Sequence, residues 1–341
     1  MEITLKELRQ WRLWAQFLTQ TAPAAEVASG LCGIQSQYAA NAVHALRIRS
    51  ENVDIKVFVK SWTLRGTLHL FPEEDLSLYL PEGGTDFFDT PYGQWRYGHG
   101  CEVSKERMGF FAQVVREALS DKPVTRDDLK ALCRERGMTE NEEPWVFDGW
   151  GGVIRMLAEG GYLCLSAAEN RAYIACPDFA PMAAEQARAE LLRRYLTHYG
   201  PVTLHDMMYF FRWTQRELKG LLAGLSPKTL TCQGQTYYYL TEPDVLPPLP
   251  RYVFLAGFDP LLLGYEKKES PFLPPEHLKK VFNNTGIVFS ALLLDGQVAG
   301  RWKEDGKYIC LTPFENWNKT QSAAVQKAAK NLWPDKPLKL I

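Results

Sequence analysis

The chain has 341 residues, of which 46% are hydrophobic and 23% are charged, an ordinary composition for a folded protein of two or three domains. The formal net charge of −1 gives no global basic field, so a nucleic-acid partner would have to be bound by local charge. The charged N-terminus has no signal-peptide core, and no apolar run approaches the roughly 20 residues that cross a bilayer. We therefore expect a cytoplasmic protein with no membrane partner.

The charges are segregated along the chain. Residues 186–220 contain six basic and three acidic side chains, a local net charge of +3, whereas residues 73–89 contain six acidic side chains and no Lys or Arg. The seven cysteines show no C-x-x-C spacing, which predicts buried thiols in a reducing compartment rather than a zinc or redox site. We therefore expect no metal and no other cofactor.

The first 50 residues predict two helices followed by a polar pair. Thr4 and Glu7 form a capping box ahead of an apolar pattern with helical spacing. A second helical run, "AAEVASGLCGI", leads directly to Gln35 and Gln37, which are separated by one serine. The glycines just before this pair make a helix end plausible there.

Residues 53–100 show sequence patterns of helices, strands and loops. The stretch "VDIKVFVKSWTLRG" is compatible with a helix, "GTLHLF" with a strand, and "PEEDLSLYL" with a helix that has proline in its first turn. Residues 81–100 are rich in glycine and aromatic side chains and predict a surface loop. Insertion of its Tyr92, Trp95 or Tyr97 into DNA is the alternative.

Two later stretches resemble each other, one beginning at Pro123 and the other at Pro201. Each reads Pro-Val-Thr and predicts an N-cap threonine, an apolar helix, a further helical run and a strand-rich tail. Two helices followed by a two-stranded hairpin match the plan of a winged helix. Because the two stretches lie too far apart in the sequence for a solenoid repeat, we predict tandem small domains.

Residues 241–250 contain four prolines and predict a linker. Beyond it, apolar runs separated by Asp-Gly turns at 295–296 and 305–306 predict a small sheet or barrel. Asp259 is expected to cap a turn. The stretch "KTQSAAVQKAAKNLW" predicts a final helix with lysines near its negative end.

Four stretches carry a family resemblance: "GLCGIQSQYAA", "LRGTLHL", "FDPLLLGY" and "LLLDGQVAGRWK". In this order they resemble the AlkZ-like (YcaQ-type) winged-helix DNA glycosylases across nearly the whole chain. The resemblance implies an α+β fold with tandem winged-helix (helix-turn-helix) domains followed by a small C-terminal β-barrel. The implied divisions are an N-terminal winged-helix-like domain with the Gln-x-Gln motif, a second winged helix, a third winged helix, and the barrel with its terminal helix: residues 1–120, 121–180, 181–242 and 250–341.

The resemblance also implies an activity. Such proteins are monofunctional DNA glycosylases that hydrolyse the N-glycosidic bond of N7-alkylated purines in double-stranded DNA, in some cases in bulky adducts and interstrand crosslinks. We expect a monomer, with the family's catalytic pair at Gln35 and Gln37. Ser36 stands where relatives carry an apolar residue, and Glu266-Lys267 stands where many carry Asp-Arg. These departures leave the substrate range open.

Glutamine suits this chemistry because an N7-alkylated guanine is already cationic. The base leaves as a neutral molecule without protonation, so an amide carbonyl suffices to orient water and face the positive charge that develops on the sugar. Residues at i and i+2 share a side only in an extended segment, so residues 34–38 must be strand-like or loop-like. The alternative is that the two glutamines merely hydrogen-bond a helix end.

The predicted DNA-binding residues are scattered. Arg47 and Arg49 alternate and are predicted to share an exposed face. Arg65 either contacts a phosphate or braces the glutamine loop, and His69 either contacts DNA or fills the core. The remaining candidates flank the second helix of the last winged-helix unit and are expected to contact the DNA backbone: Arg212, Arg216 and Lys219.

Two other classes of protein share these features. The first is a non-catalytic winged-helix DNA-binding protein such as a regulator, which would footprint a specific sequence and leave no abasic sites. The second is a protein-interaction scaffold, which would show no salt-dependent DNA affinity.

Overall fold

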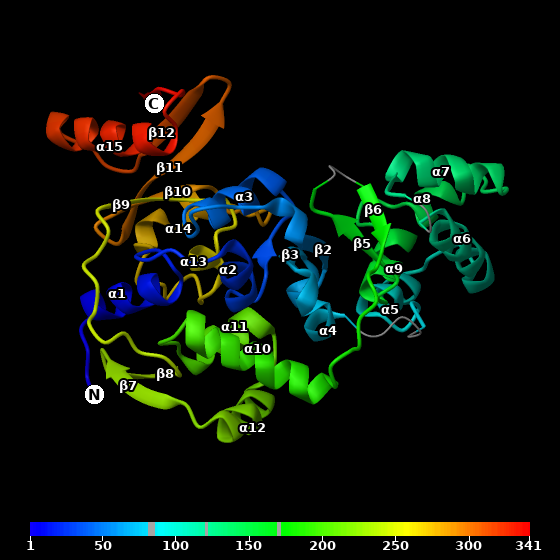
Figure 1. Ribbon diagram of the computed structural model, residues 1–341, viewed down its shortest axis with the longest axis horizontal. Helices are drawn as coiled ribbons and strands as arrows, with labels where there is room; N and C mark the ends of the chain where they lie inside the picture. Colours follow the sequence, from blue (N-terminus) through cyan, green and yellow to red (C-terminus); the bar gives the residue numbers. More distant parts are fainter. Residues whose placement is uncertain (81–85, 120–121, 169–171) are drawn as a thin grey trace. The chain divides into compact units, whose positions relative to one another are not determined.

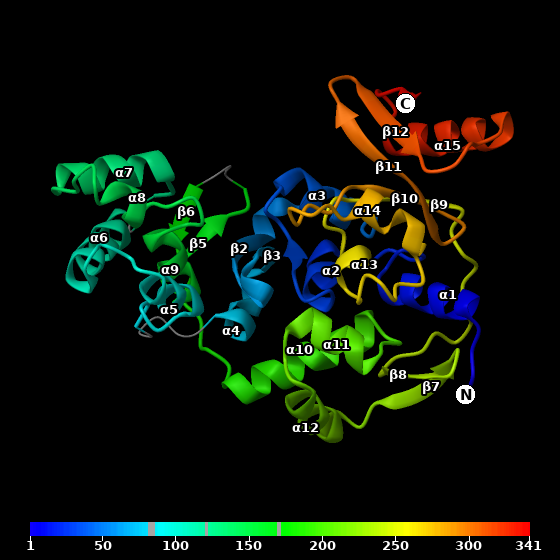
Figure 2. The same cartoon turned by 180° about the vertical axis from the view of Figure 1, so that it is seen from behind.

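The computed structural model describes residues 1–80, 86–119, 122–168 and 172–341. These residues form two compact units, whose elements Figures 1 and 2 show from opposite sides. Unit 1 consists of Met1–Val53 together with Leu192–Ile341, and unit 2 consists of Asp54–Leu191. Within the described part of the chain, no helix has both the length and the apolar composition to cross a bilayer.

Unit 1 begins with three helices and a two-residue strand: α1 (Leu5–Ala15), α2 (Ala24–Gly30), β1 (Ile34–Gln35) and α3 (Ala39–Arg47). The predicted capping box at the start of α1 is confirmed. The backbone N–H of Glu7 donates to Oγ1 of Thr4, and the Glu7 carboxylate accepts from the Thr4 N–H at 2.7 Å. This local pairing satisfies two of the N–H groups that a helix start leaves without partners.

Residues 184–240 form the second helix–hairpin segment, which comprises α10 (Ala184–His198), α11 (Leu204–Phe211), α12 (Gln215–Leu225), β7 (Lys228–Cys232) and β8 (Gln235–Tyr239). Thr203 caps α11, as the sequence predicts, and Thr214 caps α12. Val202 forms an isolated antiparallel bridge with Tyr238 of the hairpin. Leu8 and Trp11 of α1 pack with the buried side of this hairpin.

The C-terminal sheet of unit 1 is built from strands β9 (Tyr252–Leu255), β10 (Ala291–Leu294), β11 (Gln297–Asp305), β12 (Tyr308–Pro313) and β13 (Leu338–Leu340). Three helices accompany it: α13 (Pro260–Leu263), α14 (Leu278–Val281) and α15 (Lys319–Leu332). The strand order is β13-β12-β11-β10-β9, so β9 and β13 are edges. The described residues therefore form an open sheet in which no closed barrel is found, since closure would require these two edges to pair.

Across strands β11 to β13, one face of this sheet is apolar and the other carries charged side chains, whereas β9 and β10 are apolar on both faces. Val325 and Ala329 of α15 pack on the face formed by residues such as Phe254, Leu292 and Leu311. On the opposite face, the register places Lys303 and Lys339 on either side of Cys310. The alternation of side chains along each strand produces this division.

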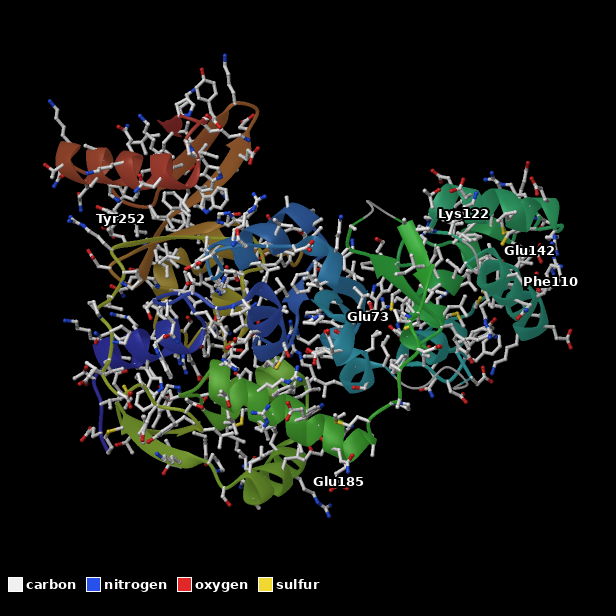
Figure 3. The ribbon with its side chains drawn as sticks, in the orientation of Figure 1. Glu73, Phe110, Lys122, Glu142, Glu185 and Tyr252 are labelled. Atoms are coloured by element: carbon white, nitrogen blue, oxygen red, sulfur yellow. The ribbon has the colours of Figure 1, made fainter. Side chains whose placement is uncertain are left out.

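Unit 2 contains a sheet with the strand order β3-β2-β5-β6-β4. Its elements are η1 (Ile55–Val57), β2 (Phe58–Trp62), η2 (Leu64–Gly66), β3 (Leu68–Pro72), η3 (Glu73–Asp75), α4 (Leu76–Tyr79), α5 (Pro91–Gly98), α6 (Lys105–Ala118), β4 (Val124–Thr125), α7 (Arg126–Glu135), α8 (Glu143–Val146), α9 (Val153–Glu159), β5 (Leu163–Ser166) and β6 (Ala172–Ala175). Arg107 of α6 donates to the carboxylate of Glu142 from Nε at 2.7 Å and from Nη2 at 2.9 Å. Glu142, which precedes α8 in the sequence, is labelled in Figure 3.

The described residues of 105–175 form the first helix–hairpin segment, which runs from α6 to β6. Thr125 caps α7 with Asp128 at the third helical position, the same arrangement that begins α11. Val124 pairs with Tyr173 of the following hairpin, as Val202 pairs with Tyr238. The repeated Pro-Val-Thr motif therefore marks two equivalent structural positions.

Two sequence predictions in unit 2 are wrong. Residues 58–62, predicted as part of a helix, form β2, because the aromatic Phe58 and Trp62 and the β-branched Val59 favour a strand over a helix. Residues 91–98, predicted as loop, form α5, whose start is set by the Thr90 cap and Pro91. Residues 81–85 of that predicted loop lie outside the described residues.

Candidate active site

Gln35 and Gln37 are joined side chain to side chain. Nε2 of Gln35 donates to Oε1 of Gln37 at 2.7 Å. Gln35 is the last residue of β1 and is 9% exposed, whereas Gln37 lies exposed two residues later. The extended backbone at β1 is the condition that the sequence set for two residues at i and i+2 to act together.

The glutamine segment leaves α2 through a tight reversal. Cys32 and Gly33 both have left-handed backbone conformations, with φ of 57° and 81°. The Gly33 N–H donates to the Ala28 carbonyl and the Cys32 N–H donates to the Ser29 carbonyl, the two bonds of a Schellman motif. The predicted helix end before the glutamines is confirmed.

The exposed Tyr38 follows the pair and begins α3. Its ring stacks on Phe258 with centroids 5.5 Å apart. Three residues further on, Asn41 packs so closely on Gly257 that a Cβ at the glycine would lie 2.6 Å from the amide nitrogen of Asn41. Phe258 of the "FDP" motif and Gly257 just before it thus pack against the start of the helix that follows the glutamines.

Arg49 does not have the exposed position that we predicted for it. It has 0% exposure, and its guanidinium binds both carboxylate oxygens of Asp259, at 2.7 and 3.1 Å. Asp259 also accepts from the Leu261 N–H, which confirms it as a turn cap. Arg47 is the last residue of α3 and Arg49 lies in the turn that follows, so the two do not alternate along an extended segment, and Arg47 alone is exposed.

Arg65 and His69 lie on the β2–β3 hairpin of unit 2. Arg65 has a left-handed φ of 59° in the tight turn and is partly exposed. His69 is 2% exposed, and burial together with the nearby Arg65 charge lowers its pKa to about 3. A neutral, buried imidazole does not fit the predicted DNA contact, so His69 is better described as a core residue.

Arg212, Arg216 and Lys219 are all exposed, as predicted. Arg212 ends α11 in a left-handed conformation, and its guanidinium lies 5.1 Å from the centre of the Tyr209 ring. Arg216 and Lys219 belong to the first two turns of α12. These three cations therefore sit at the α11–α12 turn and along the following helix.

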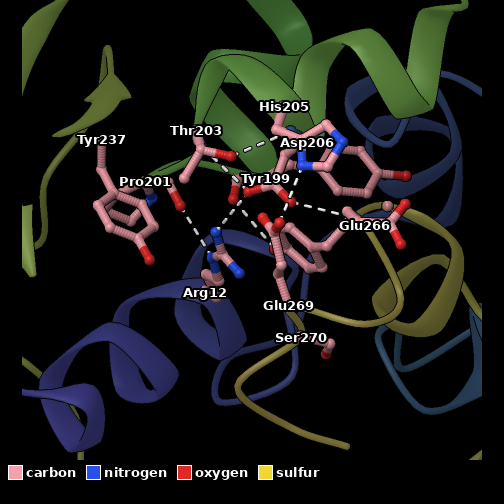
Figure 4. Close-up of polar contacts among 12 residues, drawn as sticks. Arg12, Tyr199, Pro201, Thr203, His205, Asp206, Tyr237, Glu266, Glu269 and Ser270 are labelled. Carbon is pink, nitrogen blue, oxygen red and sulfur yellow. Dashed lines mark hydrogen bonds and ion pairs between the residues drawn. The ribbon is translucent and has the colours of Figure 1, made fainter. Parts of the chain in front are cut away.

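A buried polar network links distant parts of unit 1 (Figure 4). Arg12 donates to Asp206 at 2.9 Å and to the Pro201 carbonyl at 2.8 Å. Asp206 also accepts from the backbone N–H groups of Thr203 and Glu266. The sequence does not signal this network, because Arg12 and Asp206 lie 194 residues apart.

Sequence reasoning also missed a set of exposed cations on the C-terminal sheet. Arg301 and Lys303 alternate along β11, and Lys339 follows on β13. The signal was present in the period of two along "RWK".

Among the described residues, no group of three His, Cys, Asp or Glu side chains is arranged to hold a metal ion.

Comparison with known proteins defines the class. The family model described as "DNA glycosylase AlkZ-like" matches residues 28–333, and this chain belongs to that family. The protein is therefore a DNA glycosylase, a hydrolase of DNA repair, rather than a regulator or a scaffold.

The chain is similar to a particular enzyme. It is 28% identical over 370 residues to an interstrand DNA cross-link repair glycosylase of Streptomyces sahachiroi, with 97% of this chain and 96% of the relative covered. The solved structure of Streptomyces sahachiroi DNA glycosylase AlkZ matches with a TM-score of 0.79 at 24% identity, covering 100% of both chains. The structural match shows the same mixed α and β fold.

Proposed function

We propose that this glycosylase hydrolyses the N-glycosidic bond of N7-alkylated purines in double-stranded DNA, with Gln35 and Gln37 as its catalytic pair. The observation that carries the proposal is the 2.7 Å hydrogen bond between the two amides on an extended segment. The buried Gln35 fixes the orientation of the exposed Gln37, so the pair is organised before the substrate arrives.

The chemistry follows from the charge of the lesion. The carbonyl oxygen of Gln37 accepts one N–H from Gln35 and has a second lone pair, which orients a water toward C1′ of the sugar. The negative ends of the amide dipoles stabilise the sugar cation as the base departs. Normal purines also need protonation, and because a neutral amide pair supplies no proton, the enzyme ignores them. No metal or cofactor is required.

We extend the substrate class to bulky adducts and interstrand crosslinks, because the similar Streptomyces enzyme is named for cross-link repair. The enzyme is proposed to act as a monomer. Ser36 and the Glu266-Lys267 pair are where this chain departs from its relatives, and these positions are the first to test for substrate range.

DNA is held by tandem winged helices. We propose that the two helix–hairpin segments are winged helices, within the four-part division at residues 1–120, 121–180, 181–242 and 250–341, with the C-terminal sheet as the counterpart of the family's barrel. The cations that bind phosphates are exposed, or partly exposed in the case of Arg65, and lie in several elements: Arg47, Arg65, Arg212, Arg216, Lys219, Arg301, Lys303 and Lys339. Binding of this kind follows DNA shape more than sequence.

Single-turnover release of 7-methylguanine tests the catalytic pair. Gln35→Ala and Gln37→Ala are each expected to slow excision on the order of 10²-fold, about 2.7 kcal/mol, with DNA affinity nearly unchanged. The double variant should lose less than the product of the two effects, because both amides act on one water and one cation. Activity is expected to persist in excess EDTA.

Thermal unfolding of each variant is the control for folding. A double variant that excises at the wild-type rate would show that the two glutamines only brace a helix end. Loss of excision in EDTA that a divalent metal restores would contradict the metal-free mechanism.

A further inference from the structure

Tyr199 connects the core of unit 1 to the glutamine segment. It follows the last residue of α10 and is 1% exposed. Its hydroxyl donates to the carbonyl of Leu31 at 2.9 Å. Leu31 is the C-cap of α2, is itself 0% exposed, and precedes Gln35 by four residues.

The Leu31 carbonyl is the point where the chain reverses. Helix ends leave their last carbonyls without intrahelical partners, and a buried carbonyl must find one elsewhere. The next residue, Cys32, holds a left-handed conformation that a side chain disfavours and that glycine normally provides. A bond from outside the segment therefore stabilises the direction in which the chain enters β1.

Tyr199 is in turn held by the "FDPLLLGY" motif. A Cβ at Gly264 would lie 2.2 Å from Cε1 of the Tyr199 ring, so only glycine leaves room for the ring. The hydroxyl of Tyr265 donates to the Tyr199 carbonyl at 3.0 Å, and Gln16 donates to that hydroxyl, also at 3.0 Å. The glycine and tyrosine that end the motif thus fix both the ring and the backbone of Tyr199.

We propose that Tyr199 is a positioning residue for catalysis: through the Leu31 carbonyl it sets the position of Gln35, and Gly264 and Tyr265 act by holding Tyr199 in place. This inference rests on the proposed role of Gln35. A displacement of about 1 Å in a catalytic group reduces a rate by up to about 10²-fold, so a small shift of the reversal has a measurable effect.

Tyr199→Phe removes only the hydroxyl and keeps the ring against Gly264. We expect single-turnover excision of 7-methylguanine to fall about tenfold, with the DNA dissociation constant unchanged, because the shift affects an interaction made mainly in the transition state.

Tyr92→Phe is the matched control. Tyr92 belongs to α5 of unit 2, is 4% exposed, and donates its hydroxyl to Asp148 at 2.6 Å, so its hydroxyl contacts neither the glutamine segment nor the residues that hold Tyr199. Both variants remove one buried hydroxyl and should lower the melting temperature. Only Tyr199→Phe should slow excision. An equal slowing by Tyr92→Phe would overturn the proposal, since the effect would then be a general loosening of the fold.

The decisive measurement combines Tyr199→Phe with Gln35→Ala. If Tyr199 acts through Gln35, the tenfold loss disappears in the Gln35→Ala background. A full tenfold loss in that background would overturn the positioning role. A wild-type rate for Tyr199→Phe beside a slow Gln35→Ala would overturn this inference and leave the proposed function intact. A wild-type rate for Gln35→Ala would instead overturn the proposed function itself.

Discussion

The two helix–hairpin segments use the same cap in opposite environments. In the first segment, Thr125 caps α7 and the carboxylate of Asp128 returns the bond to the cap. In the second segment, Thr203 and Asp206 do the same for α11. Asp128 is exposed, whereas Asp206 is 3% exposed.

The difference lies in what else each carboxylate binds. Asp206 also binds the buried guanidinium of Arg12 and the backbone N–H of Glu266, so it ties α1 and the segment after α13 to the start of α11. Asp128 bonds to Thr125 alone among the contacts of the described residues, at 2.7 Å to the hydroxyl and 3.0 Å to the backbone N–H. The same capping motif therefore makes local bonds in the first segment, whereas in the second segment it also binds residues that are distant in the sequence.

Asp206→Ala is expected to cause the largest loss of folding stability. It leaves the Arg12 guanidinium buried without a counter-charge, which typically destabilises a protein by about 3–5 kcal/mol. Asp128→Ala removes the same atoms from an exposed cap and should lower the free energy of unfolding much less. Urea unfolding of both variants measures the difference, and equal losses of unfolding free energy would refute the anchoring role of Asp206.

The same contrast shows what the sequence predicts well. The caps at Thr4, Thr125 and Thr203 are predicted because each depends only on residues within a few positions along the chain. The burial of Arg49 was missed because it depends on Asp259, 210 residues further on. Charge patterns cannot reveal which arginine finds a buried partner.

The candidate site likewise combines local features that the sequence predicts with long-range contacts that it does not. The extended geometry of Gln35 and Gln37 follows from glycine and helix-end signals within a few residues. The role of Tyr199 depends on a bond across 168 residues, which no local pattern encodes. The sequence pattern predicts a small sheet or barrel without deciding between them, because Asp-Gly turns specify hairpins but not whether the outer strands meet.

Acid should destabilise the second segment through His198, and the first segment contains no histidine. Burial lowers the pKa of His198 from 6.5 to about 4. Between these values the unfolded chain binds a proton that the folded chain does not, so the free energy of unfolding falls as the pH falls. The loss from pH 7 to pH 5 is about 2 kcal/mol.

His198→Phe tests this titration. Phenylalanine keeps a ring stacked on Phe17 and cannot bind a proton. Urea unfolding between pH 7 and pH 5 should show a pH dependence reduced by about 2 kcal/mol, with the dependence from buried His69 remaining. A stability curve parallel to that of the wild type would mean that His198 does not titrate in this window.

The last helices of the two segments differ in the charge that they expose. α9 of the first segment has no exposed residue, and its Arg155 is paired with Glu159 at 2.8 Å. α12 of the second segment exposes Arg216 and Lys219, and Arg212 is exposed just before it. Of the two segments, the second should therefore contribute more to the salt dependence of DNA affinity, because each phosphate contact releases about one counterion.

Replacing Arg212 and Arg216 together by Ala should reduce the slope of log affinity against log salt by about two. Between 50 and 200 mM salt this corresponds to about a 16-fold smaller loss of affinity. The matched control is the double change Arg134→Ala and Arg136→Ala, which removes two exposed arginines from the end of α7 in the first segment and should leave the slope unchanged. An equal reduction of the slope by the control pair would mean that both segments contact the phosphates of the DNA to the same extent. A slope unchanged by Arg212 and Arg216 would mean that these arginines face solvent in the complex.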